Sequence, residues 1–170
     1  MADRLSKGLA EKIRNLVLLV FDVDGVLTDG GVYLDPEGRE TKRFSTKDGL
    51  GLELAMKAGL RVALISGRSS PAVSRRAEEL GIKLVFQGVK DKKKALGAIL
   101  IKLKIGWERA AFMGDDLPDL QLKNRVAVFV APRDAVKEVR RASDVRLNSS
   151  GGCGAVREWT DLVLSFRKKV

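Results

Sequence analysis

Residues 16–30, LVLLVFDVDGVLTDG, decide the fold. The apolar run at residues 16–21 has the length and residue types of a parallel β-strand that is buried on both faces. Two carboxylates, Asp22 and Asp24, end this run, and Gly25 follows at once. Residues two apart in an extended chain point to the same side, so we expect two like charges close together at the end of a central strand.

Ligands of open α/β sheets usually bind at the carboxyl ends of the strands, where a cation between Asp22 and Asp24 would offset their repulsion. Ligands that are all oxygen favour Mg²⁺, which keeps several waters and shares its remaining positions with a phosphate. The stretch therefore predicts Mg²⁺ as cofactor. The alternative is that both aspartates only form the turn after the strand, because a D-x-D pattern alone is common.

Length and composition indicate one globular domain over residues 1–170, with 45% hydrophobic and 32% charged residues. The single cysteine, Cys153, excludes an internal disulfide framework. The absence of histidine excludes a Ser–His triad and leaves carboxylates and lysine for any acid–base chemistry. No apolar run is long enough to span a bilayer and residues 1–15 lack a signal-peptide core, so we expect a cytoplasmic protein with no membrane partner.

The formal net charge of +10 raises the question of a nucleic-acid partner. The basic residues are scattered through predicted helices, and the two Trp, one Tyr and six Phe do not interleave with them. We therefore expect no nucleic-acid partner; such a partner would show as retention of DNA or RNA that falls steeply with salt. Attraction of a small anionic substrate, or a solvated basic surface, explains the same charge.

Residues 31–45 predict a β-hairpin around the turn at residues 35–38, DPEG, projecting from the sheet. Strands and helices then alternate, which predicts right-handed crossovers and a doubly wound parallel sheet in one α/β domain. The expected strands are residues 61–65, 83–86, 107–113, 126–130 and 144–147, and the expected helices are residues 3–15, 48–59, 70–81, 91–104 and 134–142, with a short helix after residue 116 and a last helix after residue 154.

Four predicted strands are each followed by a group that phosphoryl transfer needs. Asp22 fits a nucleophile that forms an aspartyl-phosphate, and Asp24 fits the acid that protonates the leaving alkoxide and then deprotonates the attacking water. Ser66 offers a hydroxyl to the phosphate oxygens, and Lys92, at a helix start, adds positive charge beside them. Asp115, with Asp116 and Asp119 behind it, is expected to complete or orient the metal site.

Plainer structural roles exist for some of these residues. Lys92 lies in the run DKKK, which is typical of a solvated helix face. Asp116 and Asp119 could do no more than cap a helix N-terminus, which the helix dipole favours. For Asp119 we favour a role behind the metal ligands, where it would orient them.

The motifs D-x-D-G-V, S-G-R, a helix-starting lysine and G-D-D-x-x-D, in this order, resemble those of the haloacid dehalogenase-like phosphatases. The stretches FDVDGVLTDG, KRFSTKDGLG, ISGR, FQGVKDK, GDDLPDL and GGCGAVRE extend the resemblance over nearly the whole chain to one of their families, the 3-deoxy-D-manno-octulosonate 8-phosphate phosphatases of lipopolysaccharide sugar synthesis. The resemblance implies a fold without a cap domain and Mg²⁺-dependent hydrolysis of this sugar phosphate.

The resemblance also assigns roles by position. It makes Asp22 the nucleophile and a metal ligand, Asp24 the acid/base whose backbone carbonyl also binds the metal, and Asp115 the third protein ligand. Ser66 and Lys92 would hold the phosphate. The family forms a homotetramer in which the hairpin packs between subunits and a neighbour helps to cover the active site. The residues that fall where the family contacts the sugar phosphate are Ser45, Thr46, Lys47, Asp48, Gly49, Arg68 and Arg76.

One departure from the family is Glu53, which stands where some members carry arginine, so contact with the sugar carboxylate could pass to Lys42 or Arg43. The GGCG loop at residues 151–154 is either a flexible linker or, by the resemblance, part of a mobile tail over residues 148–170 near a neighbouring active site. Two functions remain as alternatives: a phosphatase for N-acylneuraminate 9-phosphate or another sugar phosphate, and a non-catalytic binding subunit. Phosphate release that Asp22→Asn abolishes would exclude the second.

Overall fold

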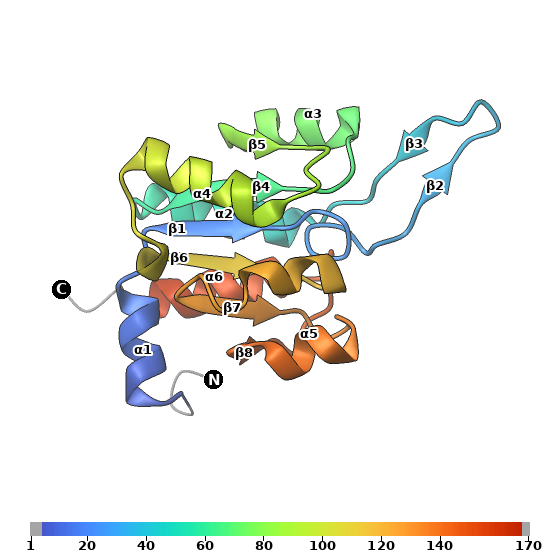
Figure 1. The fold of residues 1–170 in the computed structure, drawn as a ribbon. Helices are drawn as coiled ribbons and strands as arrows, with labels where there is room; N and C mark the ends of the chain where they lie inside the picture. Colours follow the sequence, from blue (N-terminus) through green and yellow to red (C-terminus); the bar gives the residue numbers. More distant parts are fainter. Residues whose placement is uncertain (1–4, 168–170) are drawn as a thin grey trace.

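The computed structural model describes residues 5–167, and its centre is one six-stranded parallel sheet in the order β5-β4-β1-β6-β7-β8 (Figure 1). Every neighbouring pair of strands in this sheet is parallel. The order runs outward from β1 in both directions, which confirms the doubly wound α/β fold. The strands are β1 (Leu18–Phe21), β4 (Arg61–Ile65), β5 (Leu84–Phe86), β6 (Ala110–Met113), β7 (Val128–Ala131) and β8 (Val145–Arg146).

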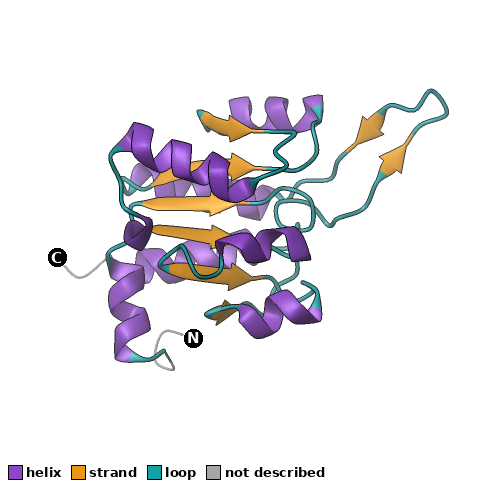
Figure 2. Ribbon diagram, viewed as in Figure 1, coloured by secondary structure: helices purple, strands orange, loops and turns teal. Residues whose placement is uncertain are grey.

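Helices cover both faces of this sheet (Figure 2). Within β1, Leu19 and Phe21 join one apolar cluster, and Leu18 and Val20 join the other, so the strand is buried on both faces as predicted. The first cluster includes residues of α1 (Lys7–Arg14), α2 (Thr46–Lys57), α3 (Pro71–Glu79) and α6 (Ala155–Ser165), and the second includes residues of α4 (Lys92–Leu103), the 3₁₀ helix η3 (Leu117–Leu122) and α5 (Lys137–Ala142).

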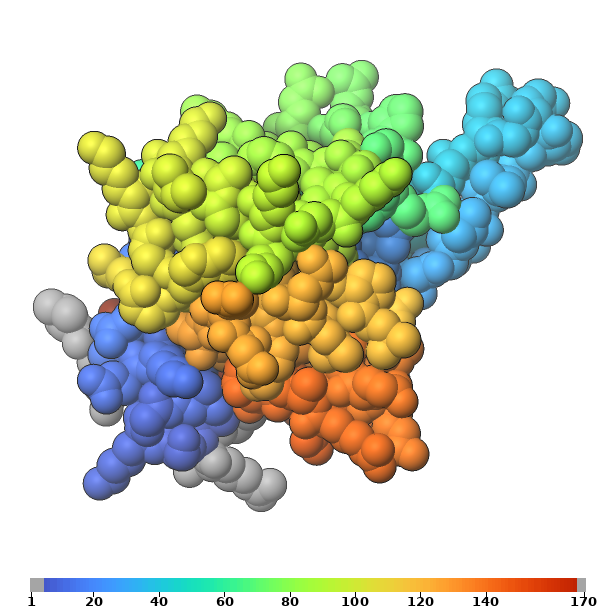
Figure 3. All heavy atoms as spheres, in the orientation of Figure 1, coloured from blue at the N-terminus to red at the C-terminus, as the bar shows by residue number. Residues whose placement is uncertain are grey.

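The predicted hairpin is present and stands clear of the sheet. Its strands β2 (Tyr33–Leu34) and β3 (Glu40–Thr41) pair antiparallel, and the space-filling view shows them protruding from the body of the molecule (Figure 3). A bridge between Thr28 and Phe44 closes its base. Within residues 5–167 the hairpin is the one insertion that leaves the sheet-and-helix layers, so no cap domain lies among these residues.

Helix α2 begins earlier than predicted. Ser45 is the residue that caps it, accepting a hydrogen bond from the Asp48 amide at 3.4 Å. The prediction that Asp48 starts the helix is wrong, because the Asp48 side chain reaches a different helix. Its two carboxylate oxygens accept from the amides of Gly154 and Arg157, at 3.1 and 2.8 Å, at the start of α6.

Strand β6 and helix α5 begin later than predicted. Residues 107–109 form a 3₁₀ turn, in which the Arg109 amide donates to the Gly106 carbonyl at 3.1 Å, so the sheet pairing begins at Ala110. Asp134 does not start α5, because its carboxylate accepts from the Gly151 amide at 2.9 Å. The predicted first helix is α1, capped by Ser6, while residues 3 and 4 lie outside the described residues.

Candidate active site

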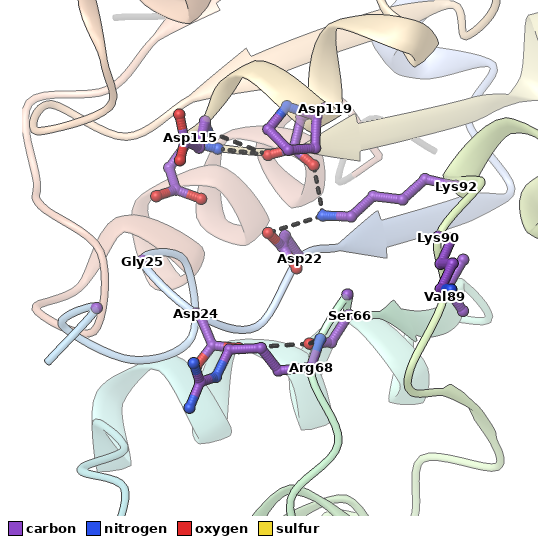
Figure 4. Close-up of a pocket in the computed structure, with 14 residues that line it drawn as sticks. Asp22, Asp24, Gly25, Ser66, Arg68, Val89, Lys90, Lys92, Asp115 and Asp119 are labelled. Atoms are coloured by element: carbon purple, nitrogen blue, oxygen red, sulfur yellow. Dashed lines mark hydrogen bonds and ion pairs between the residues drawn. The ribbon is translucent and has the colours of Figure 1, made fainter. Parts of the chain in front are cut away.

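The site lies at the carboxyl ends of β1, β4 and β6, where the strand order reverses direction (Figure 4). A cavity of about 550 Å³ opens there. The loop after β1 contributes Asp22 and Asp24, the loop after β4 contributes Ser66, the start of α4 contributes Lys92 and the loop after β6 contributes Asp115. The structure thus brings together the five residues to which the sequence assigns the chemistry.

Three carboxylates form a tight acidic cluster within this cavity. Asp22, Asp115 and Asp119 each offer an oxygen that lies within 4.8 Å of the other two. Burial, and then the charge of Asp119, raise the pKa of Asp22 to about 7, although Lys92 opposes the shift. Burial, and then the charges of Asp22, Asp119 and Asp116, raise the pKa of Asp115 to about 8. The raised pKa values show that the positive charges of the protein do not balance the negative charges of this cluster.

Two features of the Asp115 surroundings fit a divalent cation. The Oδ1 atom of Asp115 is buried and has no hydrogen-bond partner in the structure. Gly25, whose φ is +77°, lets this carboxylate come against the turn that carries Asp22 and Asp24, since an added Cβ would lie 2.0 Å from Asp115 Oδ2. Clustered carboxylates with an oxygen free to bind are the ligand type that Mg²⁺ prefers, so the residues present fit the predicted metal.

Asp119 does more than stand behind the cluster. Its Oδ2 accepts from the amides of Asp115 and Asp116, at 2.9 and 3.2 Å, which fixes the turn after β6. Its Oδ1 accepts from Lys92 at 2.6 Å. Asp116 is exposed and caps η3, accepting from the Leu117 amide at 2.7 Å. The plainer role of a helix cap therefore describes the contacts of the Asp116 side chain.

Lys92 is a buried cation between two carboxylates. Its Nζ lies 2.8 Å from Asp22 Oδ2 and 2.6 Å from Asp119 Oδ1, and only 5% of its side chain is exposed. Burial disfavours the charge, but the charges of Asp22 and then Asp119 outweigh it and raise the pKa of Lys92. The solvated-face interpretation is wrong for Lys92, because the helix start turns this lysine inward.

The Asp24 carboxylate lies apart from the acidic cluster (Figure 4). One of its oxygens contacts the Nζ of Lys42, and the other accepts from Ser66 Oγ at 3.3 Å. The structure therefore differs from the expectation of one cation between Asp22 and Asp24, because Lys42 already supplies the counter-charge for Asp24. Metal binding by the backbone carbonyl of Asp24 stays a prediction.

The predicted sugar-contact residues divide into two groups. Arg68 lines the cavity, and its guanidinium lies 2.7 Å from Glu40. Residues 45–49 and Arg76 do not line it. Arg76 instead pairs with Glu79 at 2.8 Å and donates to the Ser45 carbonyl at 3.5 Å. Contact of these residues with a substrate stays a prediction.

The sequence did not predict the contacts of the GGCG loop, residues 151–154. An added Cβ at Gly151 would lie 1.8 Å from the Gly25 carbonyl oxygen, and the Gly152 amide donates to the Val26 carbonyl at 2.9 Å. The loop thus packs directly on the turn that follows the nucleophile position, and the flexible-linker interpretation is wrong. Two glycines in a row can signal such a close approach of backbones.

The sequence also missed the partners of Lys42. Only 1% of the Lys42 side chain is exposed, and it contacts Glu40 as well as Asp24. It does not line the cavity, and neither does Glu53, which is half-buried on α2. Arg43 donates to the Gly152 carbonyl at 3.2 Å. Alternating charges at the end of a strand, here Glu40 in β3 and Lys42 directly after it, were the available signal that both point to one side.

Comparison with known proteins adds close relatives to this geometry. No protein-family model matches the chain. The chain is 38% identical over 161 residues to 3-deoxy-D-manno-octulosonate 8-phosphate phosphatase KdsC of Haemophilus influenzae, covering 95% of this chain and 89% of the relative. It is 39% identical over 166 residues to the protein of the same name from Escherichia coli K12, covering 98% and 88%.

A solved structure supports the same grouping. The 3-deoxy-D-manno-octulosonate 8-phosphate phosphatase of Moraxella catarrhalis, in complex with magnesium ion, phosphate ion and KDO, superimposes with a TM-score of 0.91 at 40% identity. The match covers 93% of this chain and 91% of that one. Fold and sequence therefore agree over nearly the whole of both chains.

Proposed function

Because this chain belongs to the 3-deoxy-D-manno-octulosonate 8-phosphate phosphatase family, we propose that it hydrolyses that sugar phosphate to the free sugar acid and phosphate. The observation that carries the proposal is the group of buried Asp22 and Asp119 and half-buried Asp115, with the Lys92 ammonium beside Asp22. This group combines a nucleophile, a cation site and a phosphate-binding charge at the carboxyl ends of the central strands.

In the proposed reaction an oxygen of Asp22 attacks phosphorus, and the bond from phosphorus to the sugar oxygen breaks. Asp24 donates a proton to the departing oxygen, which leaves an aspartyl-phosphate on Asp22. Asp24 then takes a proton from water as that water attacks the phosphoryl group and frees Asp22. Ser66 and Lys92 bind the phosphoryl oxygens throughout, as their positions on the cavity wall allow.

Asp22, Asp115 and the backbone carbonyl of Asp24 would hold Mg²⁺, which when bound offsets negative charge at the phosphoryl group. Asp119 would keep Asp115 and Lys92 in place through the hydrogen bonds described above. Arg68 is the predicted sugar contact that already lines the cavity. Residues 45–49 and Arg76 would act on the substrate only by approaching the cavity further than they do here.

We also propose a single-domain chain that assembles as a homotetramer through its hairpin. Val32, Tyr33 and Leu34 support this, because they are 53%, 47% and 64% exposed on a segment that stands away from the core. Among residues 5–167, no helix is long and apolar enough to cross a membrane. A cytoplasmic location and a role in lipopolysaccharide synthesis stay predictions.

The test is phosphate release from a panel of sugar phosphates with and without Mg²⁺. We expect 3-deoxy-D-manno-octulosonate 8-phosphate to give the highest kcat/KM, and Asp22→Asn to lower kcat by about 10³-fold or more, as removal of a covalent nucleophile does. Asp161→Asn, which changes an exposed carboxylate on α6, is the control and should keep full activity. A higher kcat/KM for N-acylneuraminate 9-phosphate would replace the proposed substrate, and full activity in Asp22→Asn would exclude the covalent route.

A further inference from the structure

Lys42 is a buried lysine beside the active site that has no role in the proposed reaction. Lys42 follows β3 of the projecting hairpin, yet its side chain is only 1% exposed. Burying an ammonium group is costly unless carboxylates surround it. Lys42 meets that condition with two, Asp24 and Glu40, the second at 3.2 Å.

The contacts of Lys42 form a chain of alternating charge across three loops. Arg68 contacts Glu40, Glu40 contacts Lys42, and Lys42 contacts Asp24. One oxygen of Glu40, Oε1, receives both Arg68 and Lys42. The two inner members, Glu40 and Lys42, each contact two groups of opposite charge, which orients both side chains.

Asp24 needs such a partner for a geometric reason. It follows Asp22 by two residues, so a cation held by Asp22 and Asp115 would attract the Asp24 carboxylate as well. A carboxylate bound to that cation could not transfer protons freely. Lys42 reaches Asp24 without lining the cavity, so it can orient this carboxylate without touching the substrate.

We propose that Lys42 is a positioning residue: with Glu40 behind it, it holds the Asp24 carboxylate out of the metal cluster and against Ser66, ready for proton transfer. The inference rests on the proposed function, since it assumes that Asp24 is the acid/base. It adds a requirement that the hairpin contribute to catalysis within its own subunit.

The test exploits the leaving group. The ratio kcat/KM covers the steps up to release of the alcohol, where a sugar alkoxide needs a proton and p-nitrophenolate does not. For Lys42→Met we expect kcat/KM to fall about 10²-fold with the sugar phosphate and less than about 5-fold with p-nitrophenyl phosphate. The Mg²⁺ concentration for half-maximal activity should not change. Lys42→Arg, which keeps the charge, should recover most of the lost rate with the sugar phosphate.

The control is Lys123→Met, because Lys123 forms a partly buried ion pair with Asp144, at 2.6 Å, outside the cavity. It should lose stability without any dependence on the leaving group. An equal loss on both substrates in Lys42→Met, or no loss on either, would overturn the proposal. The comparison uses whichever sugar phosphate the wild-type chain hydrolyses best, so a wrong substrate assignment leaves it intact.

A double variant covers the case in which Lys42→Met does not fold. Adding Lys42→Met to Asp24→Asn removes both charges of the pair, which is tolerated far better than leaving one unpaired. If Lys42 acts through Asp24, the double variant should fold and hydrolyse p-nitrophenyl phosphate at the rate of Asp24→Asn alone. A further loss on that substrate, or an unfolded double variant, would show a general structural role instead.

Discussion

The Asp115 carboxylate is held in a position where neighbouring carboxylates repel it. It lies among Asp22, Asp119 and Asp116, and its Oδ1 atom has no hydrogen-bond partner. Such an arrangement lowers the stability of the metal-free protein and becomes favourable only when a cation is bound. The Asp115 carboxylate therefore favours metal binding but lowers the stability of the metal-free protein, and a substitution at this position can separate the two effects.

Asp115→Asn should stabilise the metal-free protein and remove the stabilisation by Mg²⁺. At about pH 8.5 we expect the free energy of unfolding to rise by about 1 kcal/mol, because one of several crowded negative charges is gone. Melting curves with and without Mg²⁺ measure both effects. Asp116→Asn is the control: it keeps a good helix cap and should keep the Mg²⁺ response. A Mg²⁺ response retained in Asp115→Asn would show that Asp115 is not a ligand.

The raised pKa values of Asp22 and Asp115 also predict a pH dependence. The ordinary pKa is 3.8, and the folded values are about 7 and about 8, so between about pH 4 and 8 the folded state binds more protons than the unfolded state. The stability of the metal-free protein should therefore fall as pH rises through this window. Carboxylates with lowered pKa, such as Glu158, are ionised in both states above about pH 5.5 and do not contribute there.

Mg²⁺ must displace the same protons, so its stabilising effect should grow as pH rises from about 5 to about 8. Thermal melts across this range, with and without Mg²⁺, test the sign. Asp115→Asn should flatten the metal-free trend. A metal-free protein that becomes steadily more stable over this interval would contradict the crowding of the acids.

At the scale of elements, the start of α6 and the loop before it support the turn that carries Asp22 and Asp24. Asp48 of α2 accepts from two amides at the start of α6, and the preceding GGCG loop packs on the turn after β1. Gly51 of α2 also faces α6 closely, since an added Cβ there would lie 3.1 Å from the Arg157 Cα. The C-terminal helix is thus tied both to α2 and to the loop that carries the acids.

Gly151→Ala should destabilise the protein and weaken Mg²⁺ binding together. The new methyl group would overlap the Gly25 carbonyl, which must shift and take the Asp24–Gly25 turn with it. We expect a loss of about 3 kcal/mol, typical of strong overpacking. Chemical denaturation and Mg²⁺ titration measure the two effects. Gly8→Ala on α1, with open space around it, should instead stabilise the helix. An unchanged Mg²⁺ affinity in Gly151→Ala would separate the loop from the site.

Local patterns were enough to predict the elements and the acids. The buried strand, Asp22, Asp24, Ser66 and Asp115 follow from an apolar run that ends in polar residues, a signal contained in a few neighbouring positions. The start of α2 was wrong because Ser45 and Asp48 are both good caps, and the choice depended on Gly154 and Arg157 far along the chain. For the same reason, the local sequence did not reveal that Lys42 contacts Asp24.

At the scale of the whole molecule, the hairpin carries three consecutive exposed large apolar residues, Val32, Tyr33 and Leu34, that do not pack on the core. Substituting both Val32→Asp and Leu34→Asp should dissociate the proposed tetramer, since each copy loses apolar surface worth about 3 kcal/mol of burial. Light scattering after size-exclusion chromatography measures the mass. Ile101→Asp on α4, an 81% exposed apolar residue elsewhere, is the control. A wild-type monomer, or an unchanged tetramer in the double variant, would exclude assembly through the hairpin.

The contact of Gly25 with Gly151 also has a consequence for biosynthesis. A ribosome makes the nucleophile loop early and the glycines that brace it late, so a nascent chain carries the acids long before it can hold them in order. We therefore expect the site to bind metal ions and phosphorylated metabolites poorly until residues 151–152 have been made and have packed on the turn after β1.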